Sequence, residues 1–111
     1  MLLSLPDRLR QLAELVAILE IAGVPANEMH ASARGESHGV TVFQMGYLRR
    51  AAAALGATGI EWSTDGASFA ATLVGIGDAG VRCLTSRFDV PADVMAQLQP
   101  SLPAAAVVVP L

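Results

Sequence analysis

The sequence predicts a single α+β domain over residues 1–111, with two helices packed on one face of a mainly antiparallel sheet of four to five strands. Alternating apolar and polar residues between Ile60 and Arg87 predict strands, and apolar residues at helical spacing in Pro6 to Ala22 and Tyr47 to Leu55 predict helices. With 53% hydrophobic and 15% charged residues, the composition is that of a packed domain.

The first helix is expected from Pro6 to Ala22, with Ser4 as its N-cap and Gly23 as its stop. Its apolar stripe is wider than contact with one layer requires. We therefore expect two neighbours, the sheet of its own subunit and an element of a second subunit. The stripe consists of Leu5, Leu9, Leu12, Val16 and Leu19, widened by Leu15, Ile18 and Ala22.

The segment between the helices has weaker signals. Glu28 to Ala33 has a faint strand pattern, and Val40 to Phe43 predicts a strand. The second helix then runs from Tyr47 to Leu55, and Gly56 closes it as a C-cap. Its alanines indicate close packing on the sheet.

The central stretch predicts a three-stranded antiparallel meander. Strands from Ile60 to Ser63 and from Ser68 to Ile76 flank the turn at Asp65-Gly66, a dipeptide that adopts the positive φ angles of tight hairpin turns. A second turn at Gly77 to Gly80 leads into the strand from Val81 to Ser86. One face of the meander is apolar, so another layer must cover it.

The last part of the chain predicts a short helical segment near Ala92 to Leu98, ended by Pro100 and Pro103, followed by an uncharged strand or tail over residues 103–111. An exposed strand edge without charges invites aggregation. We therefore expect this strand to pair either with the sheet of its own chain or with a second copy.

Composition excludes some classes of protein. The net charge of −3, from seven arginines, no lysine and ten acidic residues, gives no overall attraction to phosphate backbones or anionic membranes. A single cysteine excludes an internal disulfide, and the amino terminus lacks the pattern of a signal peptide. No apolar run approaches the ~18 residues of a membrane span, so we expect a cytoplasmic protein without a membrane partner.

The order of elements, with Leu9 to Leu15, Leu48 to Ala57, Trp62 to Phe69 and the Gly-Val-Arg strand at Gly80 to Arg82, resembles a group of short uncharacterised proteins from high-GC actinobacteria and their phages. The similarity covers Leu5 to Thr85. It implies an origin in such genomes, but it implies no catalytic or binding residue.

Few residues suggest chemistry. His30 and His38, with Glu28 and Glu36, match no metal-ligand spacing, and a polar loop is the favoured interpretation. Cys83 lies in mid-strand without a cation to lower its pKa, which favours core packing over a nucleophile. Gly75 to Gly80 spells G-x-G-x-x-G but joins two strands rather than opening a helix, so it predicts a turn. We expect no catalytic residue, cofactor or metal.

The candidate interaction residues are five arginines and one tryptophan. The arginines would bind phosphates if they gathered on one face, although scattered solvated positions are the favoured interpretation. Trp62 is either a core anchor, which is favoured, or a hot spot for a partner on the open face of the sheet. The arginines are Arg34, Arg49, Arg50, Arg82 and Arg87.

These observations predict a small non-enzymatic protein–protein interaction module, acting as a homodimer with an otherwise unknown partner and derived from a phage or mobile element. The prediction rests on the lack of catalytic motifs and on the surplus apolar surface of the first helix and the tail. The alternative is a nucleic-acid-binding accessory protein that uses an arginine face.

Overall fold

The computed structural model describes residues 3–34, 37–98 and 105–111, and these form an α+β fold as predicted. Within them lie three α-helices and six strands, more than the predicted two helices and four to five strands. The helices are α1 (Leu5–Ile21), α2 (Met45–Leu55) and α3 (Ala92–Leu98), with 3₁₀ turns η1 (Ala26–Glu28) and η2 (Arg87–Asp89). The strands are β1 (Met29–Arg34), β2 (Ser37–Val42), β3 (Gly59–Thr64), β4 (Phe69–Val74), β5 (Gly80–Thr85) and β6 (Ala105–Pro110).

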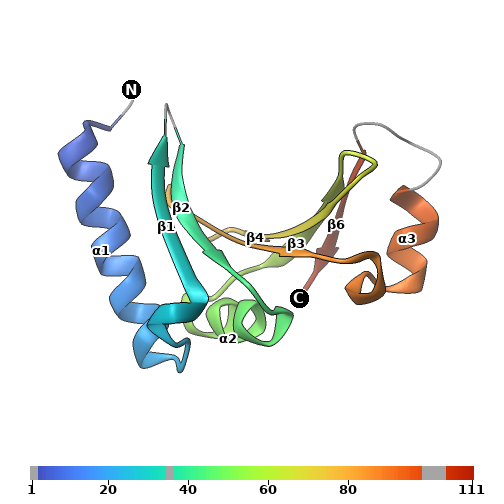
Figure 1. The fold of residues 1–111 in the computed structure, drawn as a ribbon, viewed down its shortest axis with the longest axis horizontal. Helices are drawn as coiled ribbons and strands as arrows, with labels where there is room; N and C mark the ends of the chain where they lie inside the picture. Colours follow the sequence, from blue (N-terminus) through green and yellow to red (C-terminus); the bar gives the residue numbers. More distant parts are fainter. Residues whose placement is uncertain (1–2, 35–36, 99–104) are drawn as a thin grey trace.

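The six strands form one sheet in the order β1-β2-β5-β4-β3-β6, in which only β2 and β5 are parallel. Figure 1 shows the sheet curved, with α1, α2 and α3 along its convex side. The described helices leave the concave side free. None of these helices is long and apolar enough to cross a membrane.

Two rows of cross-strand neighbours show the difference between the two faces. On the convex side, one row is apolar and lies under the helices; the adjacent row, on the concave side, is mostly polar. The convex row is Met29, Val42, Cys83, Ala71, Trp62 and Val107, and the concave row is His30, Thr41, Arg82, Thr72, Glu61 and Val108. The core therefore fills the space between sheet and helices.

The local signals of the sequence are present in the structure. The Asp7 amide donates to Ser4 Oγ at the start of α1 (3.3 Å), and Gly56 caps α2 in the left-handed conformation. In the β3–β4 turn Gly66 has a φ of +96°, and Asp65 Oδ1 accepts from the Ala67 and Ser68 amides, each at 2.9 Å. These contacts fix the predicted hairpin.

The predicted number of elements is too low for two reasons. β1 had a faint pattern because it is an edge strand of small, mostly exposed residues, held by pairing with β2. α3 was expected only as a helical segment, but its buried Val94 and Leu98 add it to the helix layer. The tail strand pairs with β3 of its own chain, one of the two predicted alternatives. Residues 99–104, with Pro100, Pro103 and the predicted start of the tail, lie outside the described residues, as does Glu36.

The parallel contact between β2 and β5 requires a glycine. Gly39 lies beside Gly80, and a Cβ at position 39 would stand 2.5 Å from the Gly80 carbonyl oxygen. Backbone cannot yield as a flexible side chain does. The two strands approach in this way only because no side chain separates them there.

The Gly39→Ala variant should therefore lose about 1–3 kcal/mol of the free energy of unfolding, the usual cost of overpacking. Gly46→Ala is the matched control, because no heavy atom lies within 4 Å of the added Cβ. It should leave stability unchanged or raise it by about 0.5 kcal/mol through helix propensity. Urea denaturation measures both values, and equal effects of the two substitutions would contradict this account.

The β3–β4 turn should make stability depend on pH. Hydrogen bonds from the Ser68 and Ala67 amides lower the pKa of Asp65, so its contribution is present above the unfolded-state pKa and lost as the pH falls through the lower folded-state pKa. Asp65→Ala should thus have a lower urea midpoint than wild type at about pH 7, and the gap should close near pH 2. Asp78→Ala, in the β4–β5 turn, is the control and should behave as wild type at both values.

Candidate interaction site

An apolar groove runs between α1 and the edge strand β1. β1 pairs with β2 on one side and with no described strand on the other. We call this region, the free side of β1 with the groove beside it, the α1/β1 edge. The groove has a volume of 400 Å³ and is lined by Leu9, Leu12, Ala13, Val16, Ala17, Glu20, Ala31, Ser32 and Ala33.

The strand at this edge lacks the usual protection against pairing. Natural edge strands carry lysine, proline, a bulge or an inward charge. The centre of β1, from Ala31 to Ala33, has only small uncharged side chains, and Ala31 and Ser32 are exposed. Beside it, Leu9 of α1 is 52% exposed. Backbone hydrogen-bonding groups and apolar surface are thus available together.

Charges of opposite sign flank the uncharged centre. Glu28 precedes the strand in η1, three residues before Ala31, and Arg34 ends the strand three residues after Ala31. Neither makes a salt bridge with another described residue. The edge therefore has a negative and a positive end, with Ala31 at its midpoint.

The five predicted arginines do not share one face. Arg49 and Arg50 lie on α2, on the convex side, where Arg50 Nη1 donates to the Gly23 carbonyl at 2.9 Å. Arg82 lies on the concave side, since its neighbours Val81 and Cys83 are buried under the helices. The single basic face required by the nucleic-acid alternative is therefore not formed by these residues.

The other two arginines lie on further elements. Arg34 ends β1, whereas Arg87 is in η2, with its Cζ 5.2 Å from the centre of the exposed Phe88 ring. Trp62 is 3% exposed and faces the helices, so it belongs to the core, the favoured interpretation, and is not available on the open sheet face.

The residues considered for chemistry are also separated. His30 lies on the concave side, and His38 faces α1, where its Nε2 is 2.6 Å from Gln11 Oε1. Burial raises the pKa of the Cys83 thiol, and the Asp89 carboxylate raises it further, which disfavours a nucleophilic thiolate. Among the described residues, no three His, Cys, Asp or Glu side chains are placed to hold a metal.

The glycine-rich segment forms the turn between β4 and β5. Gly75 and Gly77 adopt φ angles of +80° and +104°, and the chain continues into a strand. A pyrophosphate site of the dinucleotide type needs a helix N-terminus at that point. The predicted turn is confirmed.

The sequence predicted surplus apolar surface on α1, but it did not predict the free edge of β1 beside that helix or the polar row around Arg82. The α1/β1 edge depends on β1 being an outer strand, and the polar row around Arg82 depends on the parallel pairing of β5 with β2. The alternation of the meander did place Arg82 opposite its apolar face. No local pattern in the sequence predicted that β2 lies beside the strand of Arg82.

Comparison of the chain with protein-family models, with curated proteins and with solved structures found no match.

Proposed function

We propose that this chain is a non-enzymatic protein–protein interaction module that acts as a homodimer, with the second copy bound at the α1/β1 edge. The observation that carries the proposal is the unprotected strand β1 beside an exposed apolar groove. A small uncharged edge strand pairs readily with another strand, and apolar side chains beside it add burial to the hydrogen bonds.

The edge is complementary to itself. Two antiparallel copies of β1 related by a twofold axis through Ala31 pair Met29 of one copy with Ala33 of the other. The same axis brings Glu28 of each copy opposite Arg34 of the other, because both are three residues from Ala31. The two unpaired charges of each copy thus form two ion pairs at the rim of the dimer.

The position of α1 also suits this pairing. α1 contacts both β1 and β2, so it lies over the boundary between them. When β1 pairs with its copy, the β1–β2 boundary of one subunit lies two strand spacings, about 10 Å, from the same boundary of the other subunit. Helices pack at interaxial distances of about 8–10 Å. The two α1 helices would then lie side by side, and the exposed part of the stripe, including Leu9, would be covered.

The first test is the mass in solution across a dilution series, by light scattering. Wild type should have twice the monomer mass of 11.5 kDa. Leu9→Glu should place a charge in the buried interface and raise the dissociation constant about tenfold or more. Ile21→Glu is the matched control, because Ile21 is also on α1 and is 89% exposed but does not line the groove.

A monomeric wild type at all concentrations would overturn the proposal, as would equal effects of the two substitutions. Circular dichroism shows whether each variant is folded.

Charge reversal tests the register. Glu28→Arg places like charges opposite one another and should weaken the dimer by about threefold to tenfold. The double variant Glu28→Arg with Arg34→Glu restores opposite charges and should recover most of the lost affinity. Sedimentation equilibrium measures both constants. A double variant weaker than the single one would exclude this antiparallel register.

A further inference from the structure

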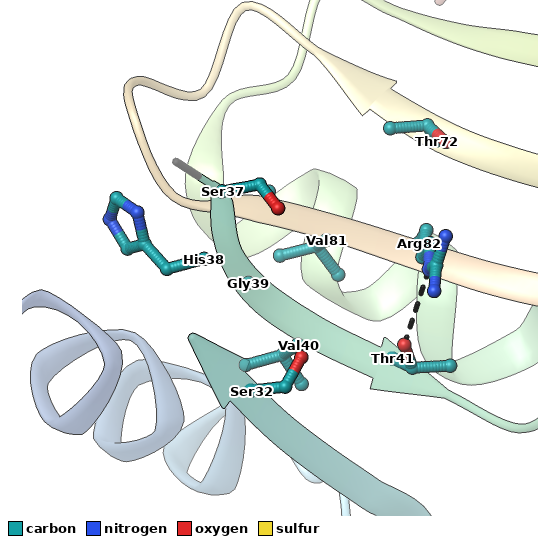
Figure 2. Close-up of a pocket in the computed structure, with 10 residues that line it drawn as sticks. Ser32, Ser37, His38, Gly39, Val40, Thr41, Thr72, Val81 and Arg82 are labelled. Atoms are coloured by element: carbon teal, nitrogen blue, oxygen red, sulfur yellow. Dashed lines mark hydrogen bonds between the residues drawn. The ribbon is translucent and has the colours of Figure 1, made fainter. Parts of the chain in front are cut away.

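The concave face of the sheet contains a polar hollow whose lining shares only Ser32 with the groove of the α1/β1 edge. The hollow has a volume of 210 Å³ and lies over β1, β2, β4 and β5. In Figure 2 the side chains of Thr41 on β2 and Arg82 on β5 lie side by side, with Ser32 on β1, Ser37 on β2 and Thr72 on β4. We call this site the Arg82 hollow.

Among the described residues that line the hollow, the basic side chains are those of Arg82 and His38. Arg82 Nε donates to Thr41 Oγ1 at 3.3 Å, which orients the guanidinium. No salt bridge joins it to a described carboxylate. Glu61 belongs to the same cross-strand row but stands two strands away, about 10 Å between backbones. The Nη donors therefore remain available.

His38 contributes no second cation inside the hollow. Figure 2 shows its ring apart from Arg82 and Thr41, and Nε2 of that ring contacts Gln11 of α1. The ligand charge must therefore be met by Arg82.

Glycines give the hollow its depth. Gly39 and Gly80 lie side by side on β2 and β5, and both line the hollow. Without side chains at these two positions, the floor is backbone, whereas hydroxyls and the guanidinium form the walls. The two glycines at the close approach of β2 and β5 thus also leave space for the site.

These features select the chemistry of a ligand. A guanidinium presents a planar fork of donors that matches two oxygens of a carboxylate or phosphate. Hydroxyls of Thr41 and Thr72 on either side can donate to the same oxygens. The volume of the hollow, 210 Å³, suits a small molecule.

We propose that the Arg82 hollow binds a small molecule through its oxyanion group, a carboxylate or a phosphate, held by the Arg82 guanidinium and the flanking threonine hydroxyls. All the lining residues come from one chain, so the site is complete in a monomer. A monomeric protein could therefore still bind the ligand, and a protein that binds no ligand could still form the dimer.

The test is an NMR titration of the ¹⁵N-labelled protein with sodium phosphate and, separately, with sodium acetate. Both ions should give saturable amide shifts at Gly39, Gly80 and Thr41 and at Arg82 Nε. Tighter binding of phosphate would identify a phosphate ester as the ligand class, and equal or tighter binding of acetate would identify a carboxylic acid.

Substitutions connect those shifts to the site. Arg82→Gln keeps a polar side chain without charge and should weaken binding about tenfold or more. Arg49→Gln is the matched control, since Arg49 is an exposed arginine on α2, across the sheet. Thr72→Val, of nearly the same shape as the native residue, should weaken binding less than Arg82→Gln.

Shifts that grow linearly without saturation would overturn the proposal, as would equal affinities for Arg82→Gln and wild type. A loss of affinity in Arg49→Gln as large as in Arg82→Gln would also overturn it, because the effect would then be one of net charge.

Discussion

The fold depends on the close approach of β2 and β5 at Gly39 and Gly80. This parallel pair joins the helix and hairpin of the N-terminal part to the four strands of the C-terminal part. The helix α2 spans this junction, because it contacts both β2 and β5. The contact between the two strands leaves no room for a side chain, because a single Cβ at Gly39 would collide with the backbone of Gly80. Both surfaces with a proposed role are built around the strands it holds.

Local signals in the sequence predicted most of the elements. The Asp65-Gly66 turn, the Ser4 N-cap and the Gly56 C-cap act through hydrogen bonds within a few residues, and each is present. Strand order is different in kind, because it depends on contacts between distant segments. β1 illustrates this point: its side chains carry almost no burial pattern, and only pairing with β2 makes it a strand.

The candidate residues show the same limit. Alternation along the meander places Trp62 with the apolar face and Arg82 opposite it, as the structure has them. It does not say whether Arg82 lies near Arg49, since one residue is on a strand and the other on a helix across the sheet. The surroundings of Arg82, two glycines and two threonines from three strands, exist only after the chain is folded.

The opposite edge of the sheet, β6, bears on how large an assembly can become. A sheet with two open edges can grow into a fibre, whereas a closed point group stops at a fixed number of subunits. β6 ends in Pro110, which has no amide to donate, and the Leu111 amide turns back to the Thr58 carbonyl (3.0 Å). The last two residues of the chain thus offer a neighbouring strand little to pair with. Addition of a strand beyond β6 is discouraged at that end, as a closed homodimer of the proposed kind would require.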